Sequence, residues 1–425
     1  MPTTPRHPTR AQRGAAALSV TLLLCFATAL LVAHTNRNLV FEQRSAANQY
    51  RAAQAFEAAE AGLEWAAARL NDGQRVGADC APSTDLAANS FRARHLDLAR
   101  ATGVFAPRTW ARSGIATALR PSCVRSAAGW SCSCPAAAAP TLAPPAGAQA
   151  APAFALEFIA TGRPGIVRVV STGCANLAGA CQPGSSGRAD ASAKVDALLG
   201  LVGALRSAPA ATVTTRGGFD AGSAAIGLHN ADPATGIAVN AGGAINAPNT
   251  RLTTPAGASK ADALLGGDAA LAALDADRFF SAHFGLSKSA WARRPGVVRI
   301  DCTLACSAAV ITAAAASADA ALIHVDGDLR LTGPLTLGSL AHPALIVVTG
   351  TARIEGAVAL NGVLHARALG WFDSHDGAFV RGALLSETGY SGNGTPALVY
   401  DRAVLDTLRL GAGGFARVPG SWRDF

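Results

Sequence analysis

The sequence predicts an α+β protein, in which one long N-terminal helix precedes a mostly β domain. Three observations support this prediction: an uncharged apolar run near the N-terminus, a polar helical continuation of that run, and short apolar segments between glycines over the rest of the chain. The 425 residues are enough for two or three domains. Much of the apolar content is alanine, and 44 residues are glycine, so neither supplies large core side chains.

The charge balance is mildly basic, with a formal net charge of +8. Such a balance can serve binding to nucleic acid or to an anionic membrane. Nucleic-acid binding usually shows as dense Lys/Arg runs with interleaved aromatic residues, and the chain has no such run. We therefore expect no direct nucleic-acid partner.

Residues 15–33 form an uncharged run of 19 residues, AAALSVTLLLCFATALLVA. As a helix it would rise about 28 Å, which is close to the roughly 30 Å core of a bilayer. Arg6, Arg10 and Arg13 precede it without any acidic residue, so the N-terminus is expected in the cytoplasm and the remainder across the membrane. A cleaved signal peptide is the alternative, but Val32-Ala33-His34 fits its cleavage site poorly.

The apolar run continues as a polar helix up to Asn71-Asp72-Gly73, a helix stop signal. Residues 34–70 contain no proline and one glycine, Gly62. One apolar stripe recurs at helical spacing and predicts a packing face, formed after Ala52 by Phe56, Ala59, Leu63, Ala66 and Leu70. Residues 15–70 would then form one helix of roughly 84 Å. This pattern fits either a helix that packs in a fibre core or a simple anchor with a stalk.

Two segments resemble a known family. Gln12-Arg13-Gly14 followed by Ala15-Ala16-Ala17-Leu18 resembles a prepilin peptidase site, with cleavage between Gly14 and Ala15. Residues 55–64, AFEAAEAGLE, are similar to the signature that follows the membrane span in PilX-type minor pilins. Type II secretion pseudopilins of the K class share part of this pattern. The resemblance covers roughly residues 10–70.

The resemblance implies a non-enzymatic subunit in the bacterial inner membrane, with one span and a periplasmic C-terminal domain that reaches the cell surface in a pilus. Its implied partners are prepilin peptidase, the inner-membrane assembly platform, and other major and minor pilins. Major pilins carry a glutamate at the position of Ser19, which in that family is thought to pair with the new N-terminal amine of a neighbour. Serine cannot form this ion pair, so the resemblance implies a minor, priming or tip subunit.

The remaining chain divides into residues 72–210, a pilin-like head with a Pro/Ala-rich loop, and residues 211–425, a β-rich domain. In the first part, residues 154–159 and 165–171 predict a hairpin, and residues 191–205 fit a third strand or a helix. In the second part, short β segments with glycine or asparagine at the corners favour a β-solenoid over a sandwich. We expect the C-terminal Trp422 and Phe425 to dock onto the body.

Nine cysteines are present, and Cys25 lies in the membrane run. An even number in an exported domain predicts disulfides. Cys174–Cys181 and Cys302–Cys306 are the obvious local pairs, while three connectivities remain open for Cys80, Cys123, Cys132 and Cys134. A zinc site at Cys132-x-Cys134 is the alternative, but no second close Cys/His pair follows, so we expect no metal.

No catalytic motif is recognisable: the chain has no His-Glu-x-x-His, no Walker loop and no Gly-x-Ser-x-Gly. We therefore expect no catalytic residue and no cofactor. Four aspartates could bind calcium, but their Asp-Gly context favours turns: Asp326, Asp328, Asp373 and Asp376. Glu57, Glu60 and Glu64 are interpreted as solvated or intersubunit charges.

The function predicted from these features is that of a minor pilin, a structural subunit in type IV pilus assembly that serves twitching, adhesion or DNA uptake. A type II secretion pseudopilin is the first alternative. A membrane-tethered β-solenoid protein acting on carbohydrate is the second, and a carboxylate cluster in a groove would favour it.

The leader is predicted to be removed between Gly14 and Ala15, because Arg13-Gly14 directly precedes the apolar run. N-terminal sequencing of the membrane-extracted protein should begin at Ala15, and the formal charge should fall from +8 to +5. A mature N-terminus near His34 would instead indicate an ordinary signal peptide.

Overall fold

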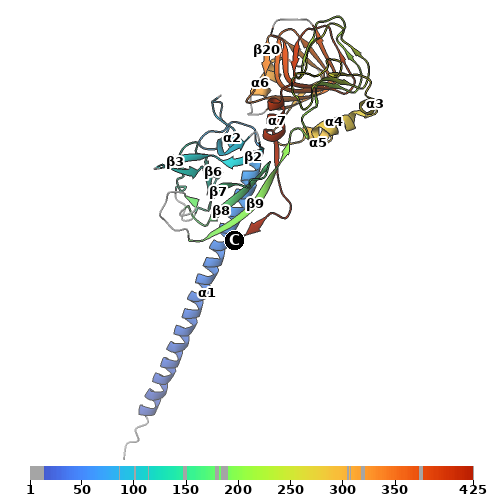
Figure 1. The fold of residues 1–425 in the computed structure, drawn as a ribbon. Coiled ribbons are helices and arrows are strands. Elements are labelled where there is room, and N and C mark those ends of the chain that lie inside the picture. The colour runs from blue at the N-terminus through green and yellow to red at the C-terminus, as the bar shows by residue number, and fades with distance from the viewer. Residues whose placement is uncertain are drawn as a thin grey trace, which may run out of the picture.

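A computed structural model describes the backbone of residues 14–85, 87–99, 102–112, 114–146, 151–177, 181–182, 190–303, 306, 308–316, 321–372 and 377–424. One helix of 58 residues, α1 (Gly14–Asn71), projects from the rest of the molecule (Figure 1). It ends at the predicted stop signal. The prediction of a long N-terminal apolar helix followed by a mostly β domain is confirmed.

The upper part of α1 packs against a seven-stranded antiparallel sheet, which we call the head sheet. The predicted hairpin is present, and residues 191–205 form a strand rather than a helix. The strands of the head sheet are, in spatial order, β26 (Gly413–Arg417), β9 (Ser192–Gly203), β8 (Ile166–Cys174), β7 (Ala153–Ala160), β5 (Ser122–Ser126) and β6 (Gly129–Ser133), with β27 (Arg423–Asp424) also on β9.

Smaller elements flank the head sheet. A short helix, α2 (Phe91–His95), leads into two antiparallel strand pairs. These are β1 (Leu96–Ala99) with β2 (Val104–Pro107), and β3 (Thr109–Arg112) with β4 (Ile115–Ala118).

The second β region contains only parallel pairs among its described strands, which form three ladders side by side. The first ladder runs β17 (Val297–Cys302), β18 (Leu322–Gly327), β21 (Ala344–Glu355), β22 (Val358–Phe372), β23 (Phe379–Ser386), β10 (Ala211–Thr215), β13 (Ile237–Ala241) and β16 (Leu264–Leu265). The second joins parts of β21 and β22 to β19 (Leu329–Thr332), β24 (Tyr390–Ser391), β11 (Phe219–Asp220) and β14 (Ile245–Asn246). The third joins parts of β22 and β23 to β20 (Leu335–Leu337), β25 (Ala397–Val399), β12 (Gly227–His229) and β15 (Arg251–Thr253).

The chain enters this stack in its middle. Strand β10 pairs with β13 on one side and with β23 on the other, so Val213 lies between Val239 and Leu384. From β16 the chain leaves the sheet through three short helices and re-enters at β17, at the opposite end of the ladder. These helices are α3 (Ala269–Ala272), α4 (Ala276–Phe284) and α5 (Lys288–Ala292). A further helix, α6 (Ala308–Ala316), follows β17.

The expected boundary of the C-terminal domain at residue 425 needs correction. Strands β26 and β27 pair antiparallel with β9, so the end of the chain belongs to the head sheet. The parallel region is therefore an insertion between β9 and β26, and α7 (Arg402–Gly411) leads back from it. Because β9 and β26 are distant in sequence, no local pattern reveals this pairing.

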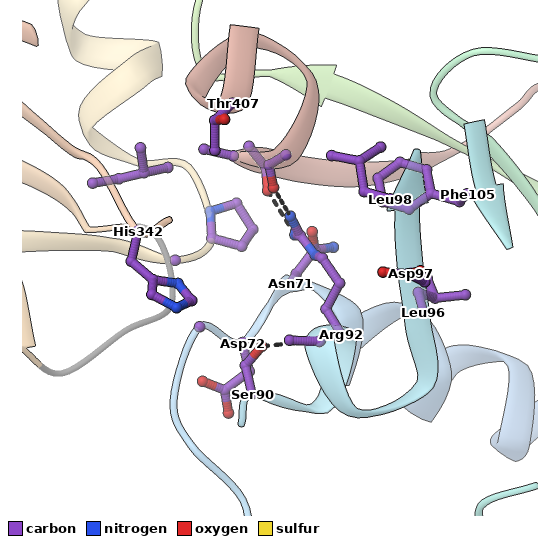
Figure 2. Close-up of a pocket in the computed structure, with 18 of the residues that line it drawn as sticks. Asn71, Asp72, Ser90, Arg92, Leu96, Asp97, Leu98, Phe105, His342 and Thr407 are labelled. Carbon is purple, nitrogen blue, oxygen red and sulfur yellow. Dashed lines mark hydrogen bonds between the residues drawn. The ribbon is translucent and has the colours of Figure 1, made fainter. Parts of the chain in front are cut away.

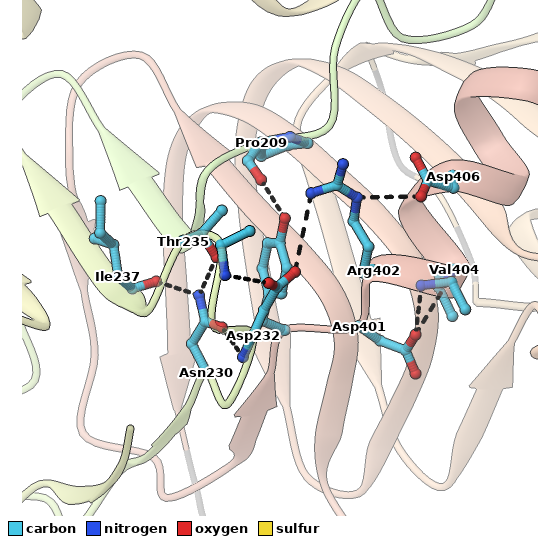
Figure 3. A network of polar contacts seen from close by, with 12 residues as sticks. Pro209, Asn230, Asp232, Thr235, Ile237, Asp401, Arg402, Val404 and Asp406 are labelled. Atoms are coloured by element: carbon cyan, nitrogen blue, oxygen red, sulfur yellow. Dashed lines mark hydrogen bonds and ion pairs between the residues drawn. The ribbon is translucent and has the colours of Figure 1, made fainter. Parts of the chain in front are cut away.

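The entry and exit of the insertion are tied together by a polar network (Figure 3). The Tyr400 hydroxyl donates to the carbonyl of Pro209, where the insertion begins. Arg402 lies 3.9 Å from Asp232, at the corner between β12 and β13, and donates to Asp406 within α7. The two ends of the insertion are thus fixed to each other and to one of its corners.

Four disulfides are present among the described residues. The two predicted local pairs are Cys174–Cys181 and Cys302–Cys306. Of the three open connectivities, the structure has Cys80–Cys134 and Cys123–Cys132. The last pair joins opposite residues of the neighbouring strands β5 and β6, a register that sequence alone does not give.

The end of α1 is held by two polar side chains (Figure 2). Asn71 donates to the carbonyl of Phe415 (2.8 Å) and accepts from its amide (2.6 Å), as a neighbouring strand would. Arg92 on α2 donates to three carbonyl oxygens: those of Leu70 (2.7 Å), Gly411 (2.9 Å) and Gly413 (2.7 Å). Its guanidinium also lies over the Phe415 ring. This junction connects α1, α7 and β26.

Replacing Arg92 with alanine should destabilise the protein by about 2–4 kcal/mol, because the carbonyl groups it serves would lose a charged donor in a part-buried site. Arg92→Lys should recover only part of the loss, since an ammonium cannot fork between three acceptors. Thermal unfolding in detergent followed by circular dichroism would measure both. Arg417→Ala, which removes an exposed ion pair with Glu64, is the matched control and should cost less than about 1 kcal/mol. Equal effects of the two alanine variants would contradict the role given to Arg92.

Candidate functional site

The lower half of α1 exposes an apolar surface on all sides (Figure 1). Its large side chains are exposed, including Leu23, Phe26 and Phe41, the last at 73%. Residues 16–71 form the one helix of the described chain that is long and apolar enough to cross a membrane, with a mean hydropathy of 2.4 in its most apolar window. No part of that window is covered by the protein itself. Such a surface needs either lipid or other helices around it.

The upper half of α1 is embedded in the head. Its fully buried residues lie on one face and contact strands β7, β8, β9 and β26: Ala55, Ala59, Gly62, Leu63, Ala66 and Leu70. Small residues let the helix approach the sheet closely. A methyl group at Gly173 of β8 would overlap the carbonyl oxygen of Ala55, so the backbones are in direct contact there.

The buried face differs from the predicted stripe at one position. Ala59, Leu63, Ala66 and Leu70 face the head as expected, but Phe56 is 37% exposed. The buried row continues to Ala55 instead, because a step of four residues back from Ala59 follows the helical repeat more closely at this level of the sheet. Within this chain Phe56 therefore points away from the head.

The acidic residues of α1 lie outside this buried face. Glu60 accepts a hydrogen bond from the Trp422 indole N–H (2.6 Å), and Glu64 pairs with Arg417 (2.5 Å). The C-terminal segment is thus docked on α1, as expected for Trp422, while Phe425 lies outside the described residues. Glu57 is exposed and has no ion pair within the described chain.

The predicted cleavage site lies at the very start of the described chain. Gly14 is the first residue of α1, Ala15 follows within the helix, and residues 1–13 lie outside the described part. The cleavage itself stays a prediction.

The aspartates assigned to turns have separate fates. Asp326 lies in β18, not in a turn, because the ladder with β17 continues through it to Gly327. Its carboxylate pairs with Arg299 at 3.0 Å and lies 3.6 Å from His324. Asp328 lies between β18 and β19 and accepts from the Thr351 amide at 2.7 Å. Asp373 and Asp376 lie outside the described residues. The interactions of Asp326 and Asp328 are structural.

A buried polar cluster escaped the sequence analysis. His365 on β22 lies 3.3 Å from Glu387, which Lys288 of α5 reaches at 2.5 Å. Burial lowers the pKa of His365, so its imidazole is neutral near pH 7. Burial alone would raise the pKa of Glu387, but His365 and Lys288 hold it below its usual value. The cluster fastens α5 to the parallel ladder, and no sequence motif marks it.

Burial also controls His95 of the head. Its imidazole lies among aromatic rings of the head core, and burial with the nearby Arg94 charge lowers its pKa to about 3. His95 is therefore neutral and behaves as an aromatic core residue.

Metal binding finds no support in the part of the chain that the structure describes. No group of three or more His, Cys, Asp or Glu residues is placed to hold an ion there. Cys132 and Cys134, the alternative zinc ligands, are each in a disulfide and so are not thiolate ligands.

Comparisons with known proteins bear on α1. Residues 13–64 match the family model described as PilX N-terminal. No curated protein matches the chain. Among solved structures, the chain is similar to the competence-associated pilin ComZ from Thermus thermophilus, with 13% identity, 88% of this chain and 98% of that chain covered, and a TM-score of 0.23. That score is too low to support any argument about the fold.

The family model covers the apolar half of α1 and most of its packed half, which are the two parts that the sequence resemblance rested on. The resemblance to PilX-type pilins is therefore confirmed for residues 13–64, the N-terminal segment of this chain.

Proposed function

We propose that the protein is a minor subunit of a type IV pilus, with a priming or tip role in assembly. The observation that carries this proposal is the match of residues 13–64 to the PilX N-terminal family on a helix that is bare and apolar below and embedded in a head above. Before assembly the bare half would lie in the inner membrane. In a fibre the same surface would be covered by neighbouring helices.

Small residues near the cytoplasmic end of α1 favour close helix contacts. Helix association in a membrane lacks the usual hydrophobic drive and depends on close fit. The described sequence begins Gly14-Ala15-Ala16-Ala17 and continues to Ser19, so backbones could approach closely there. The proposed partners are other pilins, prepilin peptidase and the inner-membrane assembly platform.

The insertion is proposed to be a β-solenoid that the pilin head carries outward. Three features support this: the parallel pairing of its described strands, the three ladders, and a repeat of similar length from one coil to the next. Leu345 pairs with Val363, 18 residues on, and Val363 pairs with Ala383, 20 residues on. Such a domain would give the subunit a large exposed surface for adhesion, twitching or DNA uptake.

Mass spectrometry of sheared surface fibres tests the proposal. The protein should be found in the fibre fraction with Ala15 as its first residue. A Gly14 variant that blocks cleavage should stay in the membrane and be absent from fibres, while its total amount is unchanged. Equal amounts of the Gly14 variant and the natural protein in fibres would contradict the proposal.

Two substitutions on neighbouring faces of α1 separate assembly from folding. Phe56→Asp places a charge on a side chain that is exposed in the single subunit, so the protein should fold but fail to enter fibres if that face is buried there. Ala59→Asp places a charge against the head sheet and should destabilise the subunit by several kcal/mol. Thermal unfolding and fibre content measured on both would show the difference.

The control substitutions are Asp326→Asn and Asp328→Asn, which alter structural contacts of the insertion and should leave the fibre content unchanged. Loss of fibres in these variants together with normal fibres in Phe56→Asp would overturn the assembly role of α1.

A further inference from the structure

Three arginines form a row on α1 between the apolar span and the head. Arg37, Arg44 and Arg51 are seven residues apart, and all three are exposed. Seven residues are about 20° short of two full helical turns, so the three guanidinium groups lie on one face over a rise of about 21 Å. We call this row the arginine face.

Carboxylates form a second row on the opposite side of the same helix. Glu57 and Glu64 are also seven residues apart, with Glu60 between them. Twenty residues, or about five and a half turns, separate Arg37 from Glu57 and also Arg44 from Glu64. The half turn places the carboxylates nearly opposite the arginines. We call this row, Glu57, Glu60 and Glu64, the acidic face.

The two faces are poorly neutralised within one chain. Among the described residues, Arg37 and Arg44 have no ion pair, and Arg51 lies 3.9 Å from Asp190 of the head. Glu57 has no ion pair in the same part of the chain, and Glu64 remains 67% exposed although Arg417 contacts it. Both rows can therefore accept an outside partner.

From this charge complementarity we infer that the partner of the arginine face is the acidic face of a second copy of this chain. The equal seven-residue spacing lets Arg37 meet Glu57 and Arg44 meet Glu64 of that copy at the same time. The inference rests on the proposed function, since it describes how α1 would pack in a fibre. It adds the partner surface and its register.

The register fixes an axial step between the two copies. Twenty residues correspond to a displacement of about 30 Å along the helix axis. The apolar run of residues 15–33 is only about 28 Å long, so two copies in this register cannot both be seated in one bilayer. The contact therefore forms after one copy has moved outward, and it belongs to the fibre and not to the membrane.

Opposite faces on one helix also set the type of assembly. A contact between two different surfaces of the same chain is heterologous, and it repeats without closing when the two copies are displaced along an axis. Exposed ion pairs are individually weak, worth about a two- to fivefold change in equilibrium each, and salt screens them. They would select the register, while the apolar lower half of α1 supplies the cohesion.

Site-directed photo-crosslinking tests this in cells that carry two differently tagged copies of the full chain. A photo-reactive residue replaces Val40, which is exposed and lies beside the arginine face, three residues from Arg37. After irradiation, sheared fibres and membranes are analysed separately for adducts that carry both tags. The adduct is expected in the fibre fraction, and its attachment site in the second copy should map near residues 57–64.

Charge reversal then tests the pairing. Arg37→Glu alone and Glu57→Arg alone should each lower the yield of the two-tag adduct about two- to fivefold. The double variant Arg37→Glu/Glu57→Arg should restore the yield. Glu42→Arg is the matched control, because Glu42 lies on the same helix but outside both pairs, and it should leave the yield unchanged.

The outcomes separate this inference from the proposed function. Protein present in fibres but crosslinked only to other subunits would overturn the second-copy partner and leave the pilin role intact. The same holds for an adduct that the charge reversals do not change. Absence of the protein from fibres would overturn both proposals.

Discussion

The structure depends on the place where α1 ends. The last turn of a helix leaves carbonyl groups without intrahelical partners, and here Arg92 serves that of Leu70 while also serving Gly411 and Gly413. Asn71 meanwhile replaces a strand neighbour for Phe415. Three segments that are far apart in sequence, namely α1, the end of α7 and the start of β26, are therefore fastened at one point. Without this junction β26 would lose its hold on α1, and the return of the chain from the insertion would be free to shift.

A second constraint is the division of labour along α1. The upper half is packed so closely that Gly173 touches its backbone, and it is not available for other partners on that face. The lower half has no partner in the chain at all. One helix therefore joins a surface completed by folding to a surface completed only by lipid or by other subunits. Phe56 lies at the transition, beside the buried Ala55 yet itself exposed, which is why it reports on assembly and not on folding.

Sequence alone could predict what depends on local periodicity. The long helix, its end at Asn71 and the hairpin of β7 and β8 follow from spacing and turn residues. The packing stripe was displaced at Phe56 because two adjacent apolar residues fit the helical repeat almost equally well, and only the sheet decides between them. The pairing of β10 with β23 joins residues about 170 positions apart, and the buried contact of His365 with Glu387 follows from that stacking. Such long-range pairings leave no local pattern.

The route by which the insertion is attached explains how it must move. It leaves the head at β9, where Arg294 of the insertion donates to the carbonyl groups of Val202 and Gly203, and it returns through α7 to the Arg92 junction. Tyr400 ties that return to the entry at Pro209. Both connections therefore reach the head close to the end of α1, and each is bridged by hydrogen bonds. Because the connections are short and doubly fixed, a displacement of α1 along its axis must carry the insertion with it, so the packing of the lower helix sets the position of the outer domain.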